Sequence, residues 1–249
     1  MRLLFSGFCS LVILDIFGVD MRAVEQAYDP GKDYVSAVTI SQEPLQEEDV
    51  SRICLVRHAP TEVSHSVIQG RSMNPSIIVD AQSVSKINDL SALPWKALYS
   101  GSSARATETF YHVGFYIQKK VHPSFLFDEQ DLGKFEGMSK KEVLHNSEFV
   151  RMSCDPSYKV DGVEKGEEVL NRFLYGMSEI AKHDKFVGVC TSYCAMNWLF
   201  KWATNNYEKT TSCDHLDVMM FQYSPSTNTY HFMKQKPMNA EEALNMIEI

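Results

Sequence analysis

The sequence predicts an α/β fold, a three-layer α/β/α sandwich around a mainly parallel central sheet. Two observations support this prediction. Short apolar runs, typical of strands that are buried on both faces, recur along the chain. Between these runs lie longer segments with apolar residues spaced by three and four, which is typical of amphipathic helices. Strands that alternate with helices indicate a parallel sheet that is covered on both faces.

Composition agrees with a folded domain and argues against one class of partner. Of the 249 residues, 44% are hydrophobic and 22% are charged, which is too apolar for a disordered chain. The formal net charge is −8, whereas a nucleic-acid binder needs clustered Lys and Arg. We therefore expect no nucleic-acid partner. A small anionic ligand remains compatible with this charge, because a local pocket can be basic in an acidic chain.

The first element is an apolar leader at residues 1–20. The apolar run over 3–19 follows Arg2 and is broken by Asp15, which is the charge-then-apolar order of a signal peptide or a short anchor. This segment favours an exported or membrane-anchored protein over a cytoplasmic one. We expect any membrane contact to run through this leader alone. The alternative is an untranslated or mis-started leader, because Met21-Arg22 repeats the opening Met1-Arg2.

Residues 21–50 show no sustained hydrophobic period and contain the turn signal Asp29-Pro30-Gly31. We predict a linker or an irregular extension there. The remaining residues, 51–249, are predicted to form one domain.

The six cysteines favour reduced thiols over a disulfide scaffold. Cys54 and Cys190 lie within apolar runs, where a free thiol behaves as a small hydrophobic side chain. No CxxC pair occurs, so a structural zinc site has no support in the sequence. We expect no other metal and no cofactor. Reduced thiols favour a reducing compartment, which disagrees with the interpretation of the leader.

From residue 52 onward the elements follow in order. The predicted buried strands are 53–56, 97–99, 125–127 and 187–190. Helices are predicted from the apolar stripes in 106–117, 169–180 and 196–203. The runs 218–221 and 230–232 flank the turn-rich segment 224–228 and predict an antiparallel pair.

Chemically useful side chains follow the predicted strands, at the sheet edge where α/β proteins bind ligands. Arg57 and His58 follow the first strand, Arg105 follows the second and Glu129 the third. This set suits a phosphate group. Two guanidinium groups can bind its oxygens, an imidazole can attack phosphorus, and a carboxylic acid can protonate the leaving oxygen. Taken singly, each residue has a plainer interpretation as a solvated strand end, a surface charge or part of an acidic loop.

These blocks resemble the histidine phosphatase superfamily, also called the phosphoglycerate mutase-like family, over residues 52–235. Four segments carry the resemblance in the family's order: LVRHAPT (55–61), SGSSARATET (100–109), FDEQDLGKFEGMS (127–139) and GEEVLNRF (166–173). In the first of them, Ala59 stands where Gly is commoner. The resemblance implies that residues 51–249 form a histidine phosphatase-like domain with no cofactor.

The resemblance also implies roles for the site residues. His58 would be the nucleophile that becomes phosphohistidine, and Arg57 and Arg105 would hold the phosphate. Glu129 would be the general acid and then the base that activates water. Helix N-termini near the pocket would add backbone N–H donors.

One position departs from the family pattern. Ser192 follows the fourth strand where the family has a second histidine, which gives the phosphate a further donor. Serine supplies only a neutral, shorter donor at this phosphate-binding position. No neighbouring histidine obviously compensates, because His183 lies before the strand and His215 lies in a later loop.

Two hypotheses follow from this departure. One is a phosphomonoester hydrolase with a phosphohistidine intermediate and low activity. The other is a pseudoenzyme that keeps the phosphate pocket and binds a phosphorylated ligand or a partner protein. Either way the expected ligand is a small phosphorylated molecule, while its identity and the oligomeric state stay open.

Overall fold

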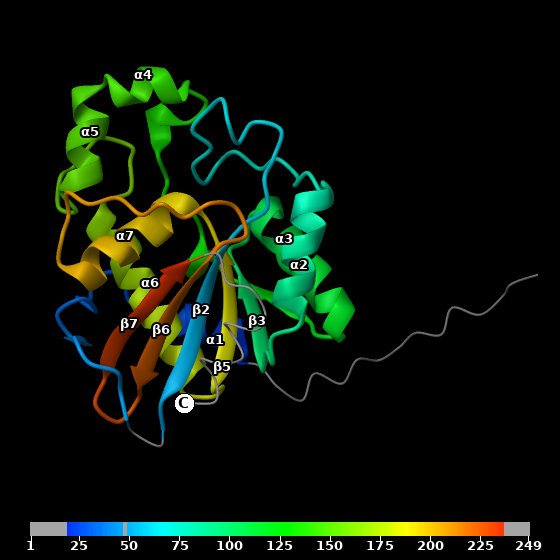
Figure 1. Cartoon of the computed structure of the whole chain (residues 1–249). Helices are drawn as coiled ribbons and strands as arrows, with labels where there is room; N and C mark the ends of the chain where they lie inside the picture. The colour runs from blue at the N-terminus through cyan, green and yellow to red at the C-terminus, as the bar shows by residue number, and fades with distance from the viewer. Residues whose placement is uncertain (1–18, 47–48, 237–249) are drawn as a thin grey trace, which may run out of the picture.

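The computed structural model describes residues 19–46 and 49–236, which form one α/β sandwich (Figure 1). The predicted leader lies almost wholly outside these residues, so export or anchoring stays a prediction. No helix within the two described ranges has the length and the apolar character needed to span a membrane.

A single seven-stranded sheet has the order β1-β7-β6-β2-β5-β3-β4. The strands are β1 (Thr39–Ser41), β2 (Ser51–Arg57), β3 (Ala97–Ser100), β4 (Val121–Pro123), β5 (Phe186–Thr191), β6 (Val218–Ser224) and β7 (Thr229–Lys236). Strand β6 runs antiparallel to both of its neighbours, and the other pairs are parallel. The mainly parallel sheet and the antiparallel pair near the end are thus confirmed.

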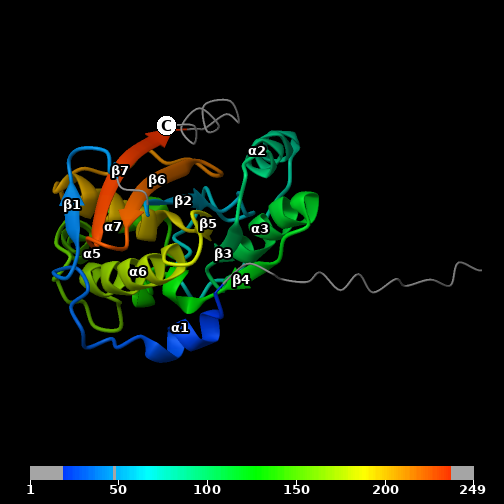
Figure 2. The ribbon, with the colours of Figure 1, turned by 90° about the horizontal axis from the view of Figure 1, so that it is seen from below.

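Helices cover both faces of the sheet (Figure 2). They are α1 (Met21–Ala27), α2 (Ala81–Ser91), α3 (Ala104–Ile117), α4 (Lys140–Leu144), α5 (Ser147–Cys154), α6 (Gly166–Ala181) and α7 (Tyr193–Thr204). Helices α1, α6 and α7 pack on one face and α2 and α3 on the other, each over its own apolar cluster. The three predicted layers are therefore present.

The strand predicted at residues 125–127 is wrong. These residues form a 3-10 helix, and the strand is β4, just before it. Pro123 has no N–H to continue the ladder, and the Ser124 hydroxyl accepts from the N–H of Leu126, which turns the chain out of the sheet. Leu126 is fully buried all the same, so its apolar neighbourhood could not separate a strand from a short helix.

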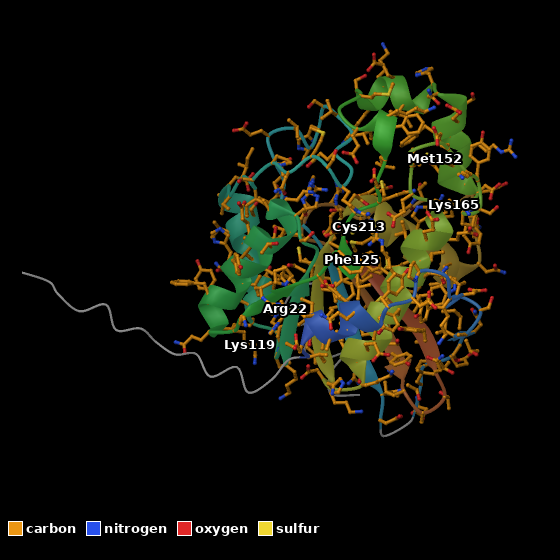
Figure 3. All side chains as sticks on the ribbon, turned by 180° about the vertical axis from the view of Figure 1, so that it is seen from behind. Arg22, Lys119, Phe125, Met152, Lys165 and Cys213 are labelled. Atoms are coloured by element: carbon orange, nitrogen blue, oxygen red, sulfur yellow. The ribbon has the colours of Figure 1, made fainter. Side chains whose placement is uncertain are left out.

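Residues 21–50, expected to be a linker or irregular extension, contain α1 and β1. Met21 and Val24 of α1 are buried, and β1 adds to the sheet edge beside β7. Viewed from behind, Figure 3 shows α1, which carries Arg22, close to Phe125 on the same face of the molecule. The backbone N–H of Phe125 donates to the carboxylate of Glu25.

A cap lies beyond the carboxyl end of β2. It consists of α4, α5 and the loop over residues 60–77 (Figure 1). A small apolar cluster that includes Leu132, Phe135 and Val143 packs inside it. The cap matters for function, because one side of the candidate site is built from it.

Candidate active site

Four of the residues predicted from the sequence surround one cavity at the carboxyl ends of the strands. Arg57, His58, Arg105 and Glu129 all line this cavity, which has a volume of about 80 Å³. Arg57 is the last residue of β2, and Arg105 is the second residue of α3 after β3. The parallel order β2-β5-β3 brings these separate chain segments to one edge.

His58 is buried, and a backbone contact fixes the orientation of its ring. It is only 4% exposed, and its Nδ1 lies 2.7 Å from the carbonyl oxygen of Ala59. A carbonyl oxygen only accepts hydrogen bonds, so Nδ1 carries the proton and the lone pair of Nε2 is left for attack. Burial, and after it the positive charge of Arg105, hold the pKa of His58 well below its ordinary value of 6.5. The imidazole is therefore neutral and nucleophilic at physiological pH.

Arg57 is held by the loop that precedes β6. Its Nη1 donates to the carbonyl oxygen of Cys213 at 2.7 Å, and its Nη2 donates to Nε2 of His215 at 3.2 Å. The guanidinium carbon lies 5.1 Å from the ring centroid of Tyr193. These contacts restrict the guanidinium to one side of the cavity.

Arg105 is fully buried and is held by the cap loop. Its Nη1 donates to the carbonyl oxygen of Met73 and its Nη2 to that of Gly70, both at 2.6 Å. Burial lowers the pKa of Arg105, but an arginine keeps its charge at physiological pH. Among the described residues no carboxylate forms an ion pair with Arg105, and a buried guanidinium of this kind suits an anionic ligand.

In both arginines the Nε–H donor makes no hydrogen bond to the described residues. The Nε atoms of Arg57 and Arg105 are buried and find no hydrogen-bond partner among the described residues. Buried N–H groups are nearly always paired, so two arginines at one cavity that each keep an unpaired Nε–H favour an anion-binding site there.

Glu129 is anchored at the start of α7. Its carboxylate accepts from the backbone N–H groups of Gln130 at 2.8 Å, Ala195 at 3.0 Å and Cys194 at 3.1 Å. Two N–H groups of the first turn of α7 thus bind Glu129, where we had expected helix N-termini to supply donors to the phosphate.

Ser192 lies at the N-cap of α7, is 2% exposed, and makes no side-chain capping bond to the helix. The cavity wall next to it is formed by Tyr193 and Cys194. Burial, and after it the charge of Glu129, raise the pKa of the Cys194 thiol well above its usual value. Cys194 is therefore a protonated thiol, which is a weak nucleophile.

Two site residues were missed from the sequence. Lys140, at the start of α4, lines the cavity and donates from Nζ to the carbonyl oxygen of Ser64 at 2.6 Å. His215 lies with its ring centroid 5.4 Å from that of His58. The pair of lysines in the motif GMSKKE was visible, but only the cap fold shows that one of them reaches the cavity.

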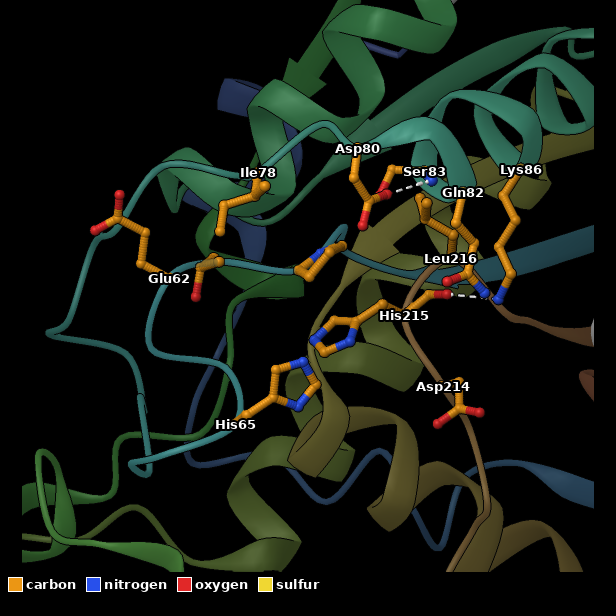
Figure 4. A pocket seen from close by; sticks show the side chains of 12 residues that line it. Glu62, His65, Ile78, Asp80, Gln82, Ser83, Lys86, Asp214, His215 and Leu216 are labelled. Atoms are coloured by element: carbon orange, nitrogen blue, oxygen red, sulfur yellow. Dashed lines mark hydrogen bonds between the residues drawn. The ribbon is translucent and has the colours of Figure 1, made fainter.

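A second, larger pocket adjoins His215 (Figure 4). Its volume is about 390 Å³, and Figure 4 shows the rings of His65 and His215 side by side in it. Glu62, Asp80 and Asp214 also line it. Within the described part of the chain, no group of His, Cys, Asp and Glu side chains could hold a metal ion.

Comparison with known families gives one match. Residues 53–235 match the model of the histidine phosphatase superfamily, branch 1. No curated protein sequence matches the chain.

Several solved structures share the fold. The mycobacterial glucosyl-3-phosphoglycerate phosphatase superposes with a TM-score of 0.62 at 15% identity, over 77% of this chain and 99% of that one. Bacillus stearothermophilus YhfR gives a TM-score of 0.62 at 18% identity, over 73% and 95% of the two chains. The phosphoglycerate mutase from Bacillus anthracis gives 0.58 at 19% identity, over 78% and 96%. At these identities the likeness is one of fold.

Proposed function

The chain belongs to the histidine phosphatase superfamily, and on that premise we propose that it is a phosphomonoester hydrolase that works through a phosphohistidine at His58. The observation that carries the proposal is the pair of buried, unpartnered Nε atoms of Arg57 and Arg105 beside the neutral His58. A phosphate bound there would pair with both guanidinium groups while its phosphorus faces the imidazole.

The reaction has two displacements. In the first, Nε2 of His58 attacks phosphorus, a P–N bond forms, and the P–O bond to the alcohol breaks as Glu129 donates its proton to the leaving oxygen. In the second, Glu129 removes a proton from water, the water oxygen attacks phosphorus, and the P–N bond breaks to release inorganic phosphate. Arg57 and Arg105 stabilise the charge on the phosphoryl oxygens in both steps.

Two features support these roles. The bond from Nδ1 of His58 to the carbonyl oxygen of Ala59 fixes the tautomer that leaves Nε2 unprotonated. Glu129 lines the same cavity as His58, so both side chains border the space in which an ester would bind. The similar mycobacterial phosphatase has been solved with VO3 and with inorganic phosphate, which are the anions that this cavity would bind.

Ser192 favours a second candidate function, binding without turnover. By the resemblance it stands where the family has its second histidine, so a neutral hydroxyl would take the place of one phosphate donor. The loss of one preorganised donor costs roughly 10²- to 10³-fold in rate. A chain with that loss could bind a phosphorylated ligand and release it unchanged.

The test is to trap the intermediate on the full chain. Brief exposure to a labelled aryl phosphate, followed by quenching, should leave acid-labile phosphate on the protein. The label should be absent from His58→Ala and present in His112→Ala, a matched control at an exposed histidine of α3. Label that persists in His58→Ala would exclude His58 as the nucleophile. Vanadate binding without label or turnover in the wild type would favour the binding function.

A further inference from the structure

A second imidazole, that of His215, lies beside His58 and comes from the loop before β6. In the sheet, β2 lies between β5 and β6. The family's second histidine would follow β5, where this chain has Ser192. His215 precedes β6, so it approaches His58 from the opposite side of β2, and the two ring centroids are 5.4 Å apart.

The backbone around His215 is fixed next to Arg57. The N–H of Leu216 donates to the carbonyl oxygen of Arg57 at 2.9 Å, and the N–H of Arg57 donates to that of Asp217 at 3.1 Å. Leu216 has a φ of 64°, which a branched side chain rarely adopts. Such a conformation persists only where the surroundings impose it, and it often marks a functional site.

A second set of contacts holds the same turn from α2. Nζ of Lys86 donates to the carbonyl oxygen of His215 and to Oδ1 of Asp217, both at 2.9 Å. The N–H of Asp214 donates to Oδ2 of Asp217 at 2.9 Å. His215 is therefore held in place from two sides.

The side chain of His215 is hydrogen-bonded to Arg57, one of the two arginines expected to bind the phosphate. Arginine only donates, so Nε2 of His215 accepts from Nη2 of Arg57. The cations near His215 are Arg57, Lys140 and Lys86, and the ring of His65 lies beside it. The carboxylates of Glu62, Asp80 and Asp214 line the same pocket. Burial, and after it Arg57, lower the pKa of His215 to about 3, so the ring is neutral and stays an acceptor.

We propose that His215 is a positioning residue that orients the guanidinium of Arg57 toward a phosphate on His58, on the side of the site opposite Ser192. The proposal rests on the proposed function, because it concerns the same phosphate site. A neutral acceptor does not replace the charge of the family's second histidine. It limits the motion of the nearest guanidinium, so the two arginines meet the phosphate in a fixed arrangement.

The experiment compares His215→Ala, His215→Gln and His215→Asn in the full chain. The amide oxygen of Gln reaches the place of the imidazole Nε2, whereas that of Asn falls short of it. Vanadate affinity and kcat/KM for an aryl phosphate should drop about 10-fold in the Ala and Asn variants, the scale of a hydrogen bond to a charged group. The Gln variant should keep most of the wild-type vanadate affinity and most of the wild-type kcat/KM. Because Gln and Asn differ only in reach, this pair keeps the test valid should the Ala variant fail to fold.

A double variant tests whether His215 acts through Arg57. In the Arg57→Ala background, His215→Ala should weaken vanadate binding by less than about twofold, since the residue it positions is gone. Two results would overturn this inference and leave the proposed function standing. One is an equal loss of vanadate affinity and kcat/KM in the Gln and Ala variants. The other is a His215→Ala effect on vanadate binding that is as large in the Arg57→Ala background as in the wild type. A wild-type chain that binds no vanadate would overturn the proposed function, and this inference with it.

Discussion

Arg172 and Glu164 form a buried ion pair, with Nε 2.8 Å from Oε1 and side chains that are 3% and 12% exposed. Arg172 also donates from Nη1 to the carbonyl oxygen of Asp128 at 2.8 Å and from Nη2 to that of Glu129 at 3.2 Å. Neither residue of the pair lines the cavity. The pair instead fixes the backbone of the loop that carries the proposed acid.

We expect Arg172→Ala to lower the free energy of unfolding by about 3 kcal/mol, the lower end for breaking a buried pair. The low end applies because Arg71 still pairs with Glu164 at 2.7 Å. Urea unfolding measures the change. The matched control is Lys134→Ala, which breaks an exposed pair with Glu148 and should cost about 1 kcal/mol or less. A loss for Arg172→Ala as small as that of the control would contradict the prediction.

The sequence predicted the central elements because local patterns define them. Strand β5 reads as a continuous apolar run since both of its faces are buried, and α3 shows its core stripe. The segment 125–127 was misassigned because short apolar runs occur in strands and in buried turns alike. Helices α4 and α5 are short and bury one residue each, Val143 and Met152, so the apolar stripe there is too short to predict a helix.

The candidate site likewise combines residues that the sequence could predict with one, His215, that it could not. Arg57, His58, Arg105 and Glu129 could be found because each lies at or within a few residues of the end of a predicted buried run, in a short motif. His215 lies 157 residues after His58, and only the antiparallel pairing of β6 with β2 brings the two rings together. Side chains that converge through long-range pairing carry no local signal, so the sequence could not assign His215.

The buried imidazole of His58 makes a prediction about pH. Because burial and Arg105 lower the pKa of His58, its ring should stay neutral as pH falls through 6.5, and it should gain a proton only well below that value. The check is an NMR titration of the ligand-free protein, with the His58 ring signal assigned by its loss in His58→Ala. A titration midpoint near 6.5 would contradict the prediction. Added vanadate should raise the pKa, because a nearby anion favours the imidazolium.

The two arginines make a prediction about anion binding. Changed singly to Ala, Arg57 and Arg105 should each weaken vanadate binding by about 1.5–3 kcal/mol, the scale of a hydrogen bond to a charged group. Isothermal titration measures this loss. Arg22→Ala, at an exposed arginine of α1, removes the same charge elsewhere and should leave the affinity unchanged. Unchanged affinity in both site variants would place the anion site elsewhere.

Ser192 is the position at which turnover and binding alone can be told apart. A histidine there would add a phosphate donor, so Ser192→His should raise kcat/KM by up to about 10²-fold on the scale of donor deletions. Space limits this gain. Tyr193 and Cys194 line the cavity, and the Tyr193 hydroxyl is held by the carbonyl oxygen of Thr211 at 3.0 Å.

The new imidazole at 192 therefore competes with the Tyr193 ring for the side of the cavity that faces Arg57, whose guanidinium carbon lies 5.1 Å from that ring's centroid. We expect the larger gain in the double variant Ser192→His, Tyr193→Gly, with Tyr193→Gly alone as its matched control. Vanadate affinity should rise together with kcat/KM, because the donor contacts the phosphate in the ground state and in the transition state. If all variants bind vanadate and none turns over an aryl phosphate, the missing donor is not what limits the reaction, and the binding function replaces the hydrolase.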